Sequence, residues 1–279
     1  MIRRRDRDIV NSTGADTIIG ASGSTTINAT GGNDFLFAGS GSTSFNNAGG
    51  VQTILGSSGA NATLNIQGGA GSIVALSYGN TQFAGGSGAD TIAGFGGSVT
   101  ITGGSGQGLY LGGPAGSNSI TGGSGQAIIL GGGAGDVLTG GTGAGDIIQA
   151  GAGATTISVA GRSGTEKLYG GAGPYLIKTG TGNANVLLGS GSTTVIAGGG
   201  VDLYSLTKGN ANVVTLQNFG TGANFLHLIG FPGNEAATAL AGAQTLSGGG
   251  QASSLKLTLS DGTSVTFAGY TGLVPQNFL

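Results

Sequence analysis

Cysteine and tryptophan are absent from this 279-residue sequence, and its only histidine is His227. The lack of cysteine excludes disulfide bonds and thiolate metal sites. A single histidine leaves no partners fixed by the sequence for a catalytic triad or an imidazole metal cluster. Neither a G-x-S-x-G nor an H-E-x-x-H motif occurs, so the sequence predicts a protein that is not an enzyme.

Charge is also scarce. Charged residues make up 7% of the chain and the net charge is −2, which gives no electrostatic basis for nucleic-acid binding. No Lys or Arg lies between Arg7 and Arg162. Arg3, Arg4, Arg5 and Arg7 therefore define a basic arm over residues 1–13. Two interpretations of this arm stay open: a solvated terminus, or a segment that docks on an acidic neighbour or an anionic cell-surface glycan.

Long apolar runs are missing as well. None reaches the roughly 18 residues that a membrane-spanning helix needs, so we expect no membrane span. The N-terminus carries charge but lacks the apolar core of a secretory signal peptide. If the protein leaves the cell, we expect the export signal to lie elsewhere in the chain.

Glycine is abundant, at 65 residues, and short apolar runs recur between glycine-rich turns every nine or ten residues. A helix of 3.6-residue period cannot give this spacing, so each unit reads as a strand and a turn. Two units form one coil of about 18 residues, which predicts an all-β parallel β-roll or β-solenoid of about 11 coils. The central apolar residues are Ile18, Ile27, Leu36, Phe45, Ile54, Leu64, Ile73, Phe83, Ile92, Ile101, Tyr110, Ile120, Ile129, Leu138, Ile148, Ile157, Leu168, Ile177, Leu187, Val195 or Ile196, Tyr204 and Val214.

One repeat unit, GGSGADTIA at residues 85–93, fits the pattern G-G-x-G-x-D-x-apolar-x. Close variants stand at residues 14–19, 31–37, 131–139 and 143–149. Over residues 14–215 the chain resembles the RTX (repeats-in-toxin) family of secreted calcium-binding β-rolls. The resemblance implies bound Ca²⁺ and export by a type I secretion system.

In RTX repeats an aspartate stands two residues before the central apolar residue, at a position here called the slot. Slot aspartates of neighbouring coils share calcium ions. Calcium requires six to eight oxygen ligands. At a spacing of about 18 residues, only Asp16 with Asp34 and Asp146 with Glu166 are neighbours, and Asp90 falls between Gly71 and Gly108. We therefore expect one to three calcium sites, and a roll held without metal stays an alternative. The candidate metal ligands are Asp16, Asp34, Asp90, Asp136, Asp146, Glu166 and Asp202.

Strand alternation turns the residues beside each central position outward. One set of outward positions is rich in Thr, Asn and Ser, which suits a glycan surface or, less well, an ice lattice. The other set is apolar, and a long exposed apolar face is expected to be covered, either by another copy or by the C-terminal segment. The apolar set is Ile19, Phe35, Phe37, Leu55, Val74, Leu109, Leu111, Ile128, Leu130, Ile147, Val186 and Leu188.

Residues 216–279 differ from the repeats, and we expect a β-rich C-terminal cap there. Residues 213–231 resemble the segment that closes RTX rolls, residues 234–243 read as a short helix, and residues 255–267 read as a hairpin around Asp261-Gly262. The final Asn-Phe-Leu is similar to the hydrophobic end of an uncleaved type I secretion signal. The implied location is the bacterial cell surface or the extracellular space.

These features favour a secreted structural protein that assembles with itself into a filament or surface layer. The alternatives are a monomeric adhesin that binds cell-surface glycan through its Thr/Asn face, and a polysaccharide-acting enzyme, which the scattered basic residues disfavour. Assembly would use the apolar face or the open coil ends. The expected assembly residues are Ile19, Phe37, Leu55, Val74, Leu109, Leu111, Ile128 and Leu130, with Arg3, Arg4, Arg5 and Arg7.

Overall fold

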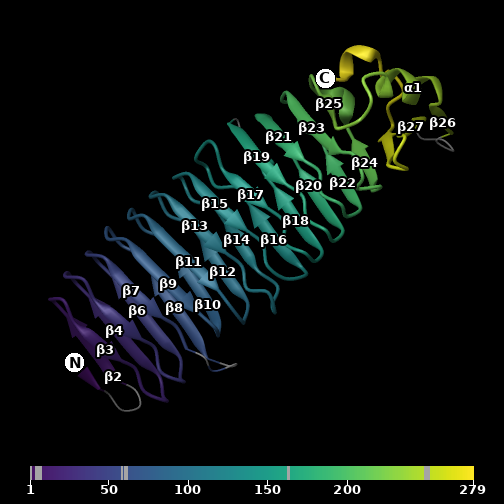
Figure 1. The fold of residues 1–279 in the computed structure, drawn as a ribbon. Helices are drawn as coiled ribbons and strands as arrows, with labels where there is room; N and C mark the ends of the chain where they lie inside the picture. Colours follow the sequence, from purple (N-terminus) through teal and green to yellow (C-terminus); the bar gives the residue numbers. More distant parts are fainter. Residues whose placement is uncertain (1, 4–7, 58, 60–61, 162–163, 248–251) are drawn as a thin grey trace. The chain divides into compact units, whose positions relative to one another are not determined.

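A computed structural model describes residues 2–3, 8–57, 59, 62–161, 164–247 and 252–279 of the chain. The fold is a parallel β-solenoid of about 12 turns, which confirms the predicted fold class and comes close to the expected coil number. The chain divides into two compact units, Met1–Asp146 and Ile147–Leu279. Within each unit, successive strands stack side by side like rungs (Figure 1).

The first unit contains two parallel sheets, one from the odd-numbered strands (sheet A) and one from the even-numbered strands (sheet B). Each strand pairs with the one two further along the chain, so the chain alternates between the sheets at every turn. Sheet A consists of β1 (Ile2–Arg3), β3 (Thr17–Ile19), β5 (Phe35–Phe37), β7 (Gln52–Leu55), β9 (Ile73–Ser77), β11 (Asp90–Gly94), β13 (Gly108–Leu111) and β15 (Ala127–Leu130). Sheet B consists of β2 (Asp8–Ser12), β4 (Thr25–Ala29), β6 (Thr43–Asn47), β8 (Thr63–Gln67), β10 (Asn80–Ala84), β12 (Val99–Thr102), β14 (Ser119–Thr121) and β16 (Asp136–Thr139).

The second unit continues the same alternation and then departs from it. Its odd-numbered strands (sheet C) are β17 (Ile147–Gln149), β19 (Thr165–Tyr169), β21 (Asn183–Leu187), β23 (Asp202–Thr207) and β25 (Phe225–Ile229). Its even-numbered strands (sheet D) are β18 (Thr155–Ser158), β20 (Tyr175–Lys178), β22 (Thr193–Ile196) and β24 (Val213–Gln217). The remaining elements are η1 (Phe219–Thr221), α1 (Glu235–Ala241), β26 (Gln244–Leu246), β27 (Ser254–Thr258), β28 (Ser264–Ala268) and η2 (Pro275–Asn277).

The C-terminal segment holds the helix and hairpin that the sequence predicts. Strand β28 pairs in parallel with β24, and β27 and β26 then add antiparallel neighbours. The buried Glu235 of α1 accepts hydrogen bonds from the Ser260 amide at 2.6 Å and the Ser260 hydroxyl at 2.8 Å. At the other end of the chain, β1 and β2 lie within residues 1–13 and pair with β3 and β4.

The centre of the core of the first unit is a stack of side chains, to which each strand from β2 on contributes one. Residues at equivalent positions of successive turns form a column, and each column follows the strand pairing. Burial of these apolar side chains is the main favourable term that holds the turns together. The central column of sheet A is Ile18, Leu36, Ile54, Ala75, Ile92, Tyr110 and Ile129, and that of sheet B is Val10, Ile27, Phe45, Ile66, Phe83, Ile101, Ile120 and Leu138.

Three details of the predicted core need correction. Leu64 and Ile73 are buried as expected, but Leu64 pairs with Thr43 and Ile73 with Gln52, so neither joins the central column. A longer turn between β7 and β8 moves the register by two residues. A shift of two residues keeps the same side chains inward, so the apolar pattern of the sequence is compatible with either register.

The second correction concerns strand β21. Leu187, predicted to be central, is 37% exposed, whereas Val186 and Leu188 are buried. Val186 pairs with Leu168 and Tyr204, so it takes the central place. Residues 186–188 are all apolar, so the sequence shows no alternation of apolar and polar residues there. An error of one residue in the register then exchanges the inner and outer faces of the strand. Val186 and Leu188 therefore leave the predicted apolar surface.

The same kind of register difference occurs near β24. Val214 is buried but pairs with Thr193, and Leu216 pairs with Val195 in the central column. Of the two candidates at 195 and 196, Val195 is the buried one.

Glycine allows the turns to approach as closely as the strands do. The amide of Ser105 donates to the Gly86 carbonyl at 2.8 Å, and the amide of Ser124 donates to the Gly104 carbonyl at 2.9 Å. A Cβ atom on Gly104 would overlap the Gly86 carbonyl oxygen, which is fixed backbone. At Gly49, by contrast, a Cβ atom meets nothing within 4 Å.

This contrast gives a stability prediction. Gly104→Ala should lower the stability of the first unit by about 1–3 kcal/mol, because the turn must move away from its neighbour. Gly49→Ala, the matched control, should be neutral or slightly stabilising. Thermal melts followed by circular dichroism compare the two variants. Equal melting temperatures would show that the turns are not closely packed.

Candidate functional site

The slot side chains point into the solenoid. Because a slot lies two residues before a central buried residue, both must face the same way on the strand. Asp34 is 3% exposed and Asp90 4%, and only Asp16 keeps intermediate exposure. The other predicted metal ligands are also buried: Asp136, Asp146, Glu166 and Asp202.

In the first unit each buried slot carboxylate accepts a hydrogen bond from the backbone of the preceding turn. The Oδ1 atom of Asp34 accepts from the Asp16 amide at 2.9 Å, and that of Asp90 accepts from the Ile73 amide at 3.1 Å. Asp136 accepts from the Asn118 amide at 2.9 Å, and Asp146 from the Ala127 amide at 2.8 Å. The acid thus satisfies a buried N–H at the start of a strand.

Uncharged amide side chains at the slot accept the same kind of backbone hydrogen bond. Gln52 Oε1 accepts from the Asp34 amide at 3.0 Å, and Asn118 Oδ1 accepts from the Val99 amide at 3.0 Å. The slot residues Asp34, Gln52 and Asn118 have in common an acceptor oxygen rather than a negative charge. Sequence reasoning missed this role of Gln52 and Asn118, although their position at the slot was the available signal.

The second carboxylate oxygen often binds the acid's own turn. Gly132 donates its amide to Asp136 Oδ2 at 2.8 Å, and Gly141 donates to Asp146 Oδ2 at 2.7 Å. In the second unit, Asp202 accepts from the Ala184 amide at 2.9 Å, from Thr179 Oγ1 at 2.7 Å and from the Tyr204 hydroxyl at 2.8 Å. These carboxylates connect turns by hydrogen bonds.

Asp16 and Asp34 are the one adjacent acid pair in the slot column of the first unit. The Ser12 hydroxyl lies 2.9 Å from Asp34 Oδ1, 3.0 Å from Asp16 Oδ2 and 3.1 Å from the Gly14 carbonyl oxygen. Asp34 Oδ2 is buried and has no hydrogen-bond partner. Two carboxylates, a hydroxyl and a carbonyl that lie together are the hard oxygen donors that Ca²⁺ prefers, so this pair fits a calcium ion.

The surroundings of Asp90 and Asp136 do not fit calcium. Asp90 stands between Ile73 and Gly108 in its column, not between Gly71 and Gly108 as predicted, so neither slot neighbour is a carboxylate. The Nδ2 group of Asn118 faces Asp136 Oδ1 at 2.7 Å and occupies it. Asp146 and Glu166 belong to different units, and their pairing stays a prediction. Among the described residues, no three His, Asp or Glu side chains gather into a metal-binding group.

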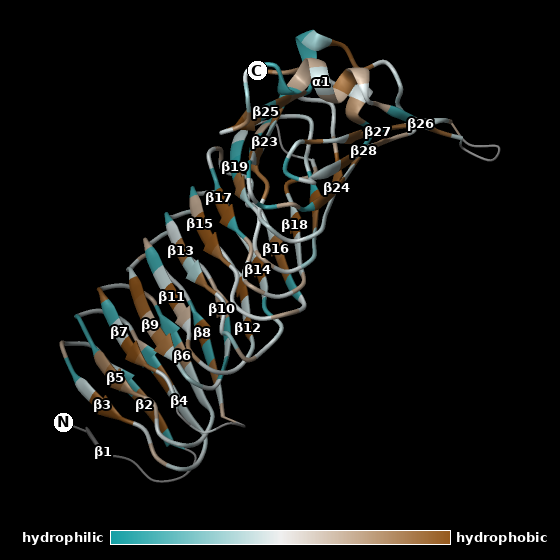
Figure 2. Ribbon diagram, turned by 45° about the vertical axis from the view of Figure 1, so that its right-hand side comes forward, coloured by the Kyte–Doolittle hydropathy of each residue, from teal (hydrophilic) through white to brown (hydrophobic). Residues whose placement is uncertain are grey.

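The outer surface of sheet A carries an apolar strip. One outward column reads Ile19, Phe37, Leu55, Leu76, Ala93, Leu111 and Leu130; the other reads Thr17, Phe35, Thr53, Val74, Thr91, Leu109 and Ile128. We call these two columns the outer apolar strip. No charged residue lies in it from β3 to β15. Phe37, Val74 and Ile128 are 41%, 37% and 38% exposed, and in Figure 2 brown segments recur from strand to strand between pale turns.

The strip does not extend through sheet C as the sequence suggested. The outward columns of the second unit contain Lys167, Asn185, Ser205 and His227, and Ile147 pairs with Lys167. The strip is therefore a feature of the first unit.

The basic arm borders the strip at one residue. Arg3, in β1, pairs in register with Ile19. Arg4, Arg5 and Arg7 lie outside the described residues.

Sheet B presents an uncharged polar outer face. One outward column reads Asn11, Asn28, Asn46, Gln67, Ala84, Thr102, Thr121 and Thr139. Its first members form an amide ladder, in which Asn28 Nδ2 donates to Asn11 Oδ1 at 2.9 Å and Asn46 Nδ2 donates to Asn28 Oδ1 at 2.8 Å. We call the outward side of sheet B the outer polar face.

No protein-family model matches the chain, and a search of curated proteins finds no match. In the part of the chain that the structure describes, no helix has the length and apolar character needed to span a membrane.

Asp90 gives a prediction about pH. Burial raises the pKa of its carboxyl to about 6, and the hydrogen bond from the Ile73 amide offsets part of that rise. A folded-state pKa above the unfolded value of 3.8 means that stability falls as the pH rises through this window. Asp90→Asn keeps the acceptor for Ile73 and removes the buried charge. It should raise stability at pH 7 by up to about 3 kcal/mol and have little effect near pH 4. Melting temperatures measured at both pH values, with chelator present, check this; an equal shift at both would contradict it.

Proposed function

We propose that the chain is a secreted, non-enzymatic structural protein of the RTX type that assembles with itself through the outer apolar strip. The observation that carries the proposal is this strip: two outward columns, free of charge over seven strands of sheet A, with Phe37, Val74 and Ile128 partly exposed. At the usual strand spacing it is about 30 Å long. Soluble monomers rarely leave a continuous apolar surface of this kind uncovered.

A second copy is the occupant that this surface favours. The strip repeats at the strand spacing, about 4.8 Å, and an identical strip has the same repeat, so apolar side chains of two copies can interdigitate along the whole length. The absence of charge removes the repulsion that two identical charged faces would have. The assembled product would be an extracellular filament or surface layer, and export would use the type I signal proposed for the C-terminus.

The assembly proposal is tested by placing charge on each face in turn. Leu111→Asp with Leu130→Asp should abolish association, because both carboxylates would be buried in the contact. Thr102→Asp with Thr121→Asp puts the same charge on the outer polar face and should leave association intact. Light scattering coupled to size-exclusion chromatography and electron microscopy give the readout. Wild-type protein that stays monomeric with and without millimolar calcium would contradict the proposal, as would equal behaviour of the two double variants.

We also propose that Ca²⁺ binds at Asp16 and Asp34, with Ser12 and the Gly14 carbonyl beside them. The support is the unpartnered, buried Asp34 Oδ2 and the closeness of the second carboxylate. A bound cation would relieve the repulsion between the two acids and satisfy the free oxygen. A Ca²⁺ ion bound there would connect the turn before β3 to the turn before β5.

Calcium should raise the melting temperature of the wild-type protein, by the equivalent of about 2.7 kcal/mol at a hundredfold excess over the dissociation constant. Asp16→Asn with Asp34→Asn should remove most of this response, because neutral amides are weak calcium ligands. Asp90→Asn is the control and should keep it. Isothermal titration and melts in calcium, magnesium and chelator provide the measurement. An unchanged calcium response in the double variant would reject this site without affecting the assembly proposal.

A further inference from the structure

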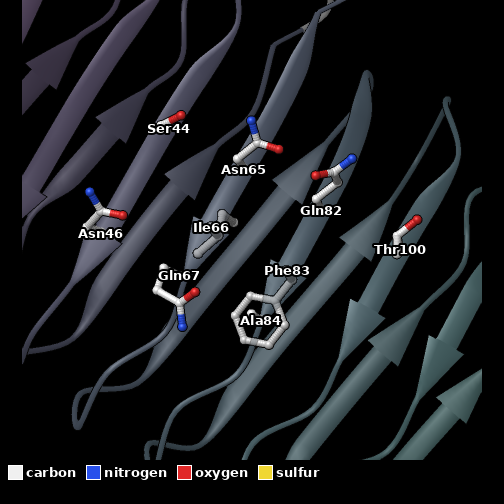
Figure 3. A pocket seen from close by; sticks show the side chains of 9 residues that line it. All are labelled: Ser44, Asn46, Asn65, Ile66, Gln67, Gln82, Phe83, Ala84 and Thr100. Atoms are coloured by element: carbon white, nitrogen blue, oxygen red, sulfur yellow. The ribbon is translucent and has the colours of Figure 1, made fainter.

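The outer polar face is hollowed where it crosses β6, β8, β10 and β12. The hollow has a volume of about 470 Å³, which lies within the usual range for small-ligand sites. Figure 3 shows its polar side chains standing on these neighbouring strands. They are Ser44, Asn46, Asn65, Gln67, Gln82 and Thr100.

The hollow arises from one short side chain. Ala84 pairs with Gln67 on one side and Thr102 on the other, so a methyl group stands where the neighbouring strands carry longer polar groups. Ile66 and Phe83 also line the hollow, but both are only 3% exposed and their side chains belong to the core.

The lining chemistry is that of a polyhydroxylated, uncharged ligand. All six polar side chains are amides or hydroxyls, which both donate and accept hydrogen bonds, as sugar hydroxyls do. A charged ligand would find no counter-charge, because no residue of the outward columns of sheet B from β4 to β16 is ionisable.

One residue of the lining carries a buried acceptor without a partner. Asn65 Oδ1 is buried and has no hydrogen-bond partner, although amide oxygens in such positions normally have one. Asn65 stands in the outward column of Ser44 and Gln82. It therefore lies outside the amide ladder of Asn11, Asn28 and Asn46.

We infer that this hollow, lined by Asn65, Gln67 and Gln82 around Ala84, binds a short neutral oligosaccharide. The inference does not depend on self-assembly, since the hollow lies on sheet B and the outer apolar strip on sheet A. Phe83, the only aromatic residue of the lining, is buried, so binding rests on hydrogen bonds and not on ring stacking. We expect a dissociation constant of about 1 mM.

The test fills the hollow without altering the core. Ala84→Gln continues the polar column and occupies the space above Ile66 and Phe83, whereas Thr121→Gln adds a similar side chain to the same column beyond the hollow. The probes are neutral trisaccharides of glucose with α- or β-linkages, and trigalacturonate as the anionic comparison. Binding is measured by ligand-observed NMR on the full chain. Thermal melts verify that each variant is folded.

We expect at least one neutral trisaccharide to bind the wild type, Ala84→Gln to weaken that binding at least tenfold, and Thr121→Gln to leave it unchanged. Asn65→Leu should also weaken it, by replacing an amide of the lining with an apolar side chain. No binding of any neutral trisaccharide at millimolar concentration would overturn the inference. So would preferential binding of trigalacturonate, or binding that Ala84→Gln does not change.

Discussion

The stacking of each turn on the previous one at strand spacing, about 4.8 Å, is the constraint on which the rest of the structure depends. A residue at any position has its counterpart from the next turn directly beside it, so each column must consist of groups that tolerate close neighbours of their own kind. Inward columns become apolar and turn columns become rich in glycine. At the slot residues Asp34, Gln52 and Asn118, a side-chain oxygen accepts from the backbone of the preceding turn. Adjacent like charges are disfavoured in every column. This constraint accounts for the small number of charged residues in a chain of 279 residues.

The slot shows how this constraint separates a structural role from a metal-binding one. Asp136 and Gln52 both accept a backbone N–H at the start of a strand, so an isolated slot acid needs no cation to explain it. Asp16 and Asp34 differ because two carboxylates follow each other in one column, and one oxygen of Asp34 remains without a partner. A calcium proposal is strongest where the stacking would otherwise place two negative charges together.

The sequence period was enough to predict the fold class, because a recurring apolar residue between glycine-rich turns has few other solutions. The central residues that it predicts are buried, apart from Leu187. It did not determine register where the period changed. The longer turn before β8 put Ile73, and not Gly71, beside Asp90, and the apolar run at 186–188 gave no alternation by which to distinguish inside from outside. The hollow around Ala84 was also beyond reach, since a short side chain matters only once its column neighbours, Gln67 and Thr102, are known.

Irregularities within regular columns also bear on how identical copies could align. A perfectly uniform apolar strip would allow two copies to slip past each other by one turn at little cost, and the assembly would lack a defined register. The outer apolar strip is not uniform. Ala93 leaves a step between Leu76 and Leu111, and the Phe35 and Phe37 rings, 4.7 Å apart, form a bulky end. Bulky and small positions of two copies can match in few alignments, so the same departures from the repeat that obscure the sequence pattern would give the proposed contact its specificity.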